Sequence, residues 1–123
     1  MKYVLILVAA IALSLPAFAQ HKHGAQKGPN GGAMQDVAGV HAELVTSGNT
    51  LTLNIFDESN KPISTAGFSG SALIVAGTER ETVALAPTGS NALKGEAKKA
   101  VGSGAAITVM VKTAAGKTGQ VKF

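Results

Sequence analysis

The chain contains no cysteine and no tryptophan, and its 123 residues include only one tyrosine and four phenylalanines. Without disulfides, a domain of this size must draw its stability from packed apolar surface. Aromatic rings on which sugars or bases could stack are equally scarce. The formal net charge is only +4, and no arginine-rich run is present. These absences argue against a nucleic-acid or sugar ligand.

The first 19 residues have the pattern of a secretory signal peptide. Lys2 precedes an apolar run over residues 4–15, and Pro16-Ala17-Phe18-Ala19 supplies the small-x-small cleavage pattern. The apolar run is shorter than the roughly 20 residues that a transmembrane helix needs. We therefore expect cleavage after Ala19, a periplasmic protein, and no membrane span after cleavage.

Residues 20–32 are polar and rich in glycine, which predicts a flexible lead. Within it, Gly31-Gly32 is predicted to form a turn that requires positive φ and sets the start of the first strand. Residues 33–123 are expected to form one domain.

Apolar and polar residues alternate along several short segments of that domain, which is typical of strands buried on one face. The segments are residues 40–45, 51–56, 81–85, 107–112 and 121–123. Glycine-, asparagine- and proline-containing turns separate them, at residues 47–49, 57–62, 76–79, 87–91 and 115–117. The spacing predicts an all-β fold, an antiparallel β-sandwich of about seven or eight short strands. The phenylalanines of the domain are expected in its core.

The three histidines, His21, His23 and His41, lie in one stretch of the chain. Imidazole is the commonest metal-ligand side chain. Residues i and i+2 of a strand face the same side, so His41 and Glu43 should share the face opposite the apolar side chains. Met34, expected on the preceding strand, would add a thioether ligand that favours Cu(I). The pattern predicts a metal site, and the alternative is a solvent-facing His41 paired with Glu43.

His21 and His23 also offer a second kind of site. Cleavage after Ala19 would free an amine one residue before His21, and amine, backbone and imidazole nitrogens can enclose Cu(II) or Ni(II). Cyclisation of Gln20 would remove that amine. The alternative is a tail whose histidines have no function.

No arrangement of catalytic residues is recognisable. The chain lacks a cysteine nucleophile, a Ser/His/Asp order and a His-Glu-x-x-His helix, and its seven carboxylates lie in no apolar cleft pattern. We expect neither enzymatic activity nor an organic cofactor.

Two runs of sequence, residues 28–45 and residues 51–63, resemble a known family. They read Gly-Pro-Asn-Gly-Gly followed by His-Ala-Glu-Leu, and then Leu-Thr-Leu-Asn-Ile-Phe-Asp followed by Lys-Pro-Ile. The pattern is similar to small periplasmic β-sandwich proteins and domains associated with the adaptor proteins of heavy-metal (RND-type) efflux systems. The chain departs from it at Lys27, where the family has histidine.

The resemblance implies a periplasmic role in binding or passing copper, zinc, nickel or a related cation. It adds Asp57 to His41 and Glu43 as positions that match the family. The first hypothesis is therefore a periplasmic metal-binding or carrier protein that works with an efflux adaptor. The alternative is a non-catalytic module of the cell envelope that binds a protein partner through its sheet edges. A third interpretation is a protein without a specific ligand, whose histidines are incidental.

Overall fold

The structure is a computed structural model, and it describes residues 26–123. The expected signal peptide, residues 20–25 and with them His21 and His23 lie outside the described residues. Within residues 26–123 the chain forms nine strands: β1 (Gln26–Lys27), β2 (Ala33–Val37), β3 (Val40–Ser47), β4 (Thr50–Phe56), β5 (Ser69–Ala76), β6 (Glu79–Pro87), β7 (Ala92–Glu96), β8 (Ala106–Lys112) and β9 (Thr118–Lys122). In this part of the chain there is no helix long and apolar enough to cross a bilayer.

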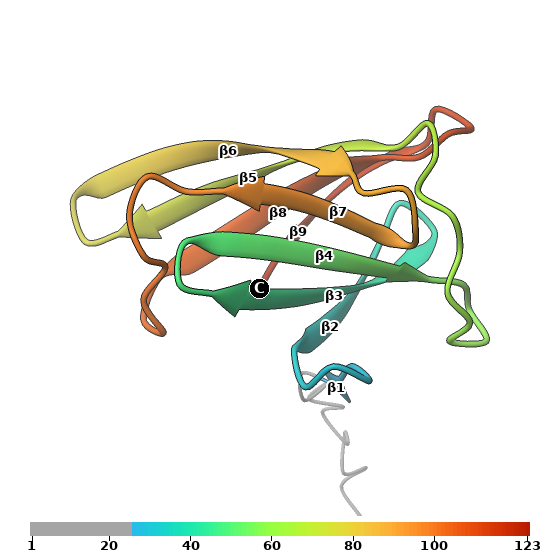
Figure 1. Cartoon of the computed structure of the whole chain (residues 1–123), viewed down its shortest axis with the longest axis horizontal. Coiled ribbons are helices and arrows are strands. Elements are labelled where there is room, and N and C mark those ends of the chain that lie inside the picture. The colour runs from blue at the N-terminus through green and yellow to red at the C-terminus, as the bar shows by residue number, and fades with distance from the viewer. Residues whose placement is uncertain (1–25) are drawn as a thin grey trace, which may run out of the picture.

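All neighbouring strands run antiparallel, in the order β1-β2-β3-β4-β7-β6-β5-β8-β9 (Figure 1). The predicted all-β, antiparallel class is confirmed. The strands form one hydrogen-bonded sheet, where the sequence predicted two packed sheets. The reason lies in β6, which pairs with β5 over most of its length and then passes to β7 at Ala86 and Pro87. This one strand joins what would otherwise be two separate sheets.

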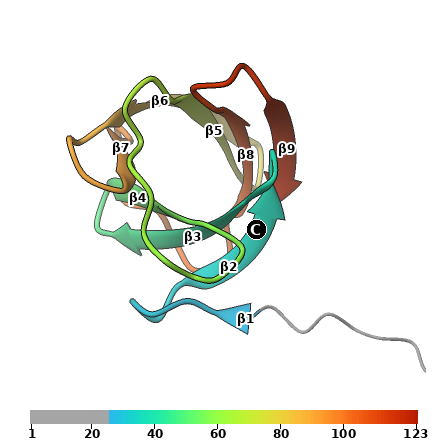
Figure 2. The same cartoon turned by 90° about the vertical axis from the view of Figure 1, so that its right-hand side faces the viewer.

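The sheet curls around its own apolar face, and Figure 2 shows its strands arranged in a ring. The curl brings β9 beside the turn between β2 and β3. A Cβ on Gly119 of β9 would lie 2.6 Å from the backbone nitrogen of Ala38. The two ends of the sheet can therefore approach this closely only because position 119 has no side chain.

The core consists of the side chains that alternate inward along the strands. Leu51, Leu53 and Ile55 of β4 are fully buried, as is Val109 of β8. Of the phenylalanines expected in the core, Phe68 belongs to it and Phe123 packs against it, whereas Phe56 is buried outside this main cluster. The alternation predicted β3, β4, β6, β8 and β9. It did not delimit β5, because the five consecutive apolar residues 72–76 hide the period of two, and it did not mark β1, β2 or β7.

The predicted hairpins are also present. Ser47 and Thr50 close one turn, and Ala76 and Glu79 close another. The turns at residues 88–91 and 113–117 join β6 to β7 and β8 to β9. Gly31 has a φ of 80°, as expected for the turn before the first long strand.

Candidate functional site

The hairpin of β2 and β3 carries three of the six predicted site residues, Met34, His41 and Glu43. Ala38 and Gly39 have φ values of 50° and 80°. Positive φ at both central residues is typical of the two-residue type I′ turn. Such a turn fixes the register, so Asp36 lies directly opposite His41.

The imidazole of His41 lies between two oxygen atoms. Its Nε2 is 3.2 Å from Asp36 Oδ1, and its Nδ1 is 2.9 Å from Asn60 Oδ1. With the Asn60 amide oriented as in the structure, its oxygen can only accept a hydrogen bond, so Nδ1 carries the ring proton. A neutral ring then turns the lone pair of Nε2 toward a carboxylate that is also an acceptor. A proton or a metal ion between these two atoms would satisfy both of them.

The pair is open to solvent on one side. The side chain of His41 is 24% exposed and that of Asp36 is 84% exposed. The histidine is therefore held by the fold, whereas the carboxylate can move to meet a ligand.

Asp57, which the family resemblance proposed as a ligand, orders the loop that presents Asn60. Its Oδ1 accepts hydrogen bonds from the backbone nitrogens of Ser59 and Lys61, at 2.8 and 2.9 Å. Asn60 sits inside this loop with a φ of 61°. Asp57 therefore affects His41 only indirectly, because it orders the loop that places Asn60 Oδ1 beside His41 Nδ1.

Glu43 has a different environment from the one expected. It shares a face with His41, but it is fully buried, because the turn of residues 28–32 covers it. Its Oε2 accepts hydrogen bonds from the backbone nitrogens of Asn30, at 2.8 Å, and Gly32, at 3.0 Å. Its Oε1 accepts from the side-chain amides of Asn30, at 2.8 Å, and Asn54, at 3.4 Å. Both oxygens are thus occupied by donors of the protein itself.

The remaining candidates lie toward the amino terminus. Met34 is half-buried on β2, and the register places it opposite Glu43, two residue pairs along the strands from Asp36 and His41. Residues 26–32, expected in the flexible lead, instead form β1 and the turn over Glu43.

The described residues supply two donors for a cation. Nowhere in residues 26–123 do three His, Asp or Glu side chains gather as a metal site. The structure brings His41 together with Asp36 and Asn60, neither of which the sequence analysis named. The Ala-Gly dipeptide at 38–39 was the available signal for Asp36, because a two-residue hairpin turn there places residues 36 and 41 opposite each other.

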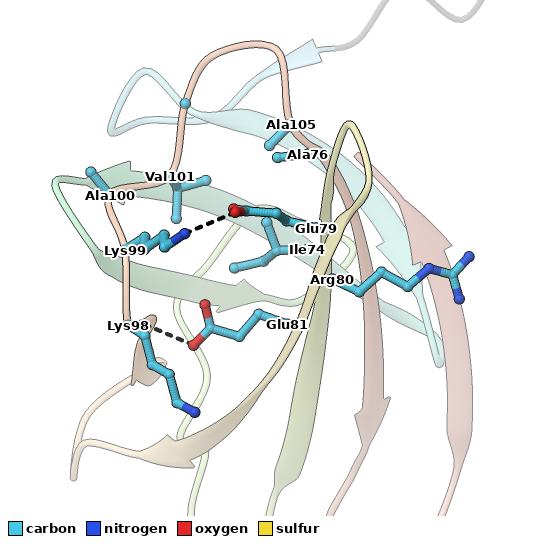
Figure 3. Close-up of a pocket in the computed structure, with 11 residues that line it drawn as sticks. Ile74, Ala76, Glu79, Arg80, Glu81, Lys98, Lys99, Ala100, Val101 and Ala105 are labelled. Carbon is cyan, nitrogen blue, oxygen red and sulfur yellow. Dashed lines mark hydrogen bonds and ion pairs between the residues drawn. The ribbon is translucent and has the colours of Figure 1, made fainter.

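A separate cavity of about 340 Å³ lies between the β5–β6 hairpin and residues 97–105 (Figure 3). Backbone hydrogen bonds tie this loop to the β3–β4 turn, so the cavity lies at the end of β3 away from His41. One ion pair and one hydrogen bond join its two walls: Lys99 Nζ is 2.9 Å from Glu79 Oε1, and Glu81 Oε1 accepts from the backbone nitrogen of Lys98 at 2.7 Å. This ion pair lowers the pKa of Glu79 and raises that of Lys99. The contacts fasten the loop to the hairpin.

Comparison with known proteins gave no match: no family model, no curated protein and no solved structure is similar to the chain.

Proposed function

We propose that the protein binds a transition-metal ion of the copper, zinc or nickel type in the periplasm, with His41 and Asp36 as two of its ligands. The observation that carries the proposal is the 3.2 Å separation of His41 Nε2 and Asp36 Oδ1, two lone-pair donors that face each other. A metal ion between them would satisfy both atoms.

The separation suits a shared ion. Zinc–nitrogen and zinc–oxygen bonds of about 2.0–2.1 Å at a tetrahedral angle place the two donor atoms roughly 3.3 Å apart. The observed distance is close to this value. Only small movements of the exposed carboxylate would be needed to admit the ion.

The surroundings of His41 also favour ligation. Metal-binding histidines usually donate their second ring N–H to an oxygen, which fixes the tautomer and the orientation of the ring. Asn60 Oδ1 accepts in this way from His41 Nδ1. The loop ordered by Asp57 would therefore serve as the outer support of the site.

Two donors make an incomplete site, and we propose that His21 and His23 supply the others. β1 begins at Gln26, opposite Met34 on β2, the strand that carries Asp36. His23 precedes Gln26 by three positions, so the chain keeps their Cα atoms within about 11 Å of each other.

A carrier role follows from the chemistry of these ligands. Protons compete with the metal for imidazole, so affinity should fall as the pH falls. The exposure of Asp36 would permit release to a partner, and the resemblance of residues 28–45 and 51–63 to efflux-associated proteins supports an efflux adaptor in that role. Glu43 is left out of the proposed ligand set, because its oxygens are already occupied.

The alternative, a module that binds a protein through its sheet edges, has less support. The edge strands are β1 and β9. β1 has two residues, and β9 approaches the turn between β2 and β3. The curl of the sheet thus leaves little free edge for strand addition.

The test is calorimetric titration of protein purified from the periplasm, whose mass also reports cleavage after Ala19. We expect Zn(II), Cu(II), Ni(II) or Cu(I) to bind with a Kd below about 0.1 mM, the equivalent of roughly 5 kcal/mol. His41→Ala should weaken binding at least tenfold and Asp36→Asn severalfold, whereas the exposed control Glu58→Gln should bind like the wild type. Absence of binding at this level, or a His41→Ala variant that binds normally, would refute the proposal.

A further inference from the structure

We infer that Asn30 is a site of spontaneous covalent modification, at which deamidation releases the turn of residues 28–32 from the buried carboxylate of Glu43. Asn30 is the only asparagine of the chain that is followed by glycine. It is also the residue through which the turn makes two of its hydrogen bonds to Glu43. Because no metal ion takes part, this modification is independent of the proposed function.

Asparagine is a thermolabile residue, because its side-chain amide can be lost. The backbone nitrogen of Gly31 gives its proton to base and attacks Cγ of Asn30, which closes an imide ring. The Cγ–Nδ2 bond breaks, and the side-chain nitrogen takes up the proton that base removed and leaves as ammonia. Water then opens the ring. Aspartate results where the bond from nitrogen to Cγ breaks, and isoaspartate where the bond from nitrogen to the main-chain carbonyl carbon breaks.

The residue after Asn30 favours ring closure at this position. Gly31 has no Cβ, so nothing on it obstructs the approach of its nitrogen to the side chain of the preceding residue. A Cβ built on Gly31 would meet no atom within 4 Å, so this side of the turn faces solvent. Asn30 is itself exposed, which lets water reach the imide.

The closed turn engages both reacting groups in hydrogen bonds. Asn30 Nδ2 donates to Glu43 Oε1 at 2.8 Å, and Gly31 N donates to Gly28 O at 3.0 Å. Both bonds must open before the nitrogen can reach Cγ. The reaction therefore proceeds from the opened turn, and the contact with Glu43 slows it.

The product would no longer fit over Glu43. This carboxylate is fully buried, and three of its four hydrogen bonds come from Asn30 and Gly32. Replacement of the side-chain amide by a carboxylate removes a donor and sets two like charges against each other. In the isoaspartate product, the main chain between these two backbone nitrogens also gains one carbon, although both donate to Oε2 in the closed turn. Deamidation is therefore a one-way opening of the turn.

The first measurement is peptide mass spectrometry of the purified protein during incubation in mildly alkaline buffer. Residue 30 should gain the mass difference between an NH₂ and an OH group, through an intermediate that has lost ammonia. Asn49 is the internal control. It is exposed in a turn, and its Nδ2 also donates a hydrogen bond, to Ala97 O at 2.9 Å, but Thr50 follows it. Asn49 should remain unmodified while residue 30 reacts.

The second measurement is amide hydrogen exchange of Asn30→Asp, which has the side chain of one product. Protection of the amides of residues 30 and 32 should fall at least about tenfold, because a hydrogen bond to a charged acceptor is lost and a like charge is added. Asn30→Ala loses the same donor without the charge and should show a smaller fall. Asn54→Ala is the matched control: Asn54 donates to the same carboxylate at 3.4 Å from β4, outside the turn, and its loss should leave these amides close to wild type.

Wild-type protein in which residue 30 has reacted should show the same loss of protection as Asn30→Asp. The inference is overturned if residue 30 is still asparagine after prolonged incubation, if Asn49 reacts as fast, or if Asn30→Asp keeps wild-type protection. Equal losses in Asn30→Asp and Asn30→Ala would also overturn it, because the new charge would then not act on Glu43.

Discussion

Replacing Glu43 by glutamine should destabilise the fold more than any other single exchange of a carboxyl for an amide in the described chain. The carboxylate is fully buried and accepts hydrogen bonds from Asn30, Gly32 and Asn54. A glutamine side chain has only one acceptor oxygen. Its NH₂ group must face the side-chain NH₂ of Asn30 or Asn54, so two donors oppose each other unless that asparagine amide rotates.

The magnitude follows from the three short bonds. A hydrogen bond to a charged acceptor contributes about 1.5–3 kcal/mol, and a neutral one about 1 kcal/mol. If rotation of the Asn30 amide rescues its bond, loss of the charge still costs roughly 0.5–1 kcal/mol per bond, which is about 2 kcal/mol over the three bonds. In a domain of this size, 2 kcal/mol corresponds to a fall in Tm of roughly 8–16 °C.

The assay is thermal and urea unfolding followed by far-UV circular dichroism, because the described chain has no tryptophan or tyrosine to report by fluorescence. Glu58→Gln, an exchange of the same chemistry at an exposed loop position, is the control and should change stability by less than about 0.5 kcal/mol. A loss below about 0.5 kcal/mol in Glu43→Gln would refute the reasoning, because the carboxylate would then not be the charged acceptor of these bonds.

Three further predictions concern the core, the close approach of β9 and the ion pair. Leu53→Ala should cost about 3 kcal/mol in urea unfolding, because Leu53 is fully buried in the core. Gly119→Ala should lower Tm, because its Cβ would meet the backbone nitrogen of residue 38, whereas Gly102→Ala, which faces open space, should leave Tm nearly unchanged. Lys99 lowers the pKa of Glu79, so the stabilisation from their ion pair should be present above the ordinary carboxyl range and be lost as the pH falls through the lowered pKa. An NMR titration should show the pKa of Glu79 return toward its ordinary value in Lys99→Ala. An unchanged pKa in this variant would contradict the pairing.

The strands of this protein could largely be predicted from its sequence. The alternation along residues 40–45 and 51–56 requires one face to be buried, and the turn residues between them allow little besides a hairpin. The exceptions were β5, whose continuous apolar run carries no period of two, and β1, β2 and β7, which the alternation did not mark.

The candidate site was only partly predictable. The position of His41 on the outer face of β3 follows from the alternation, and its pairing with Asp36 could have followed from the two-residue turn at 38–39. Its contact with Asn60, 19 residues away, could not, because it depends on how the loop ordered by Asp57 folds back over the sheet.

Glu43 shows most clearly which features follow from the sequence and which depend on the tertiary structure. The sequence alone determined which strand it occupies and that it faces away from the core, because side chains alternate along a strand whatever surrounds it. The tertiary structure alone decided that the turn of residues 28–32 covers it and that β6 joins the strands into one curled sheet. Such contacts depend on segments that meet across the fold, and local patterns of residues do not encode which segments will meet.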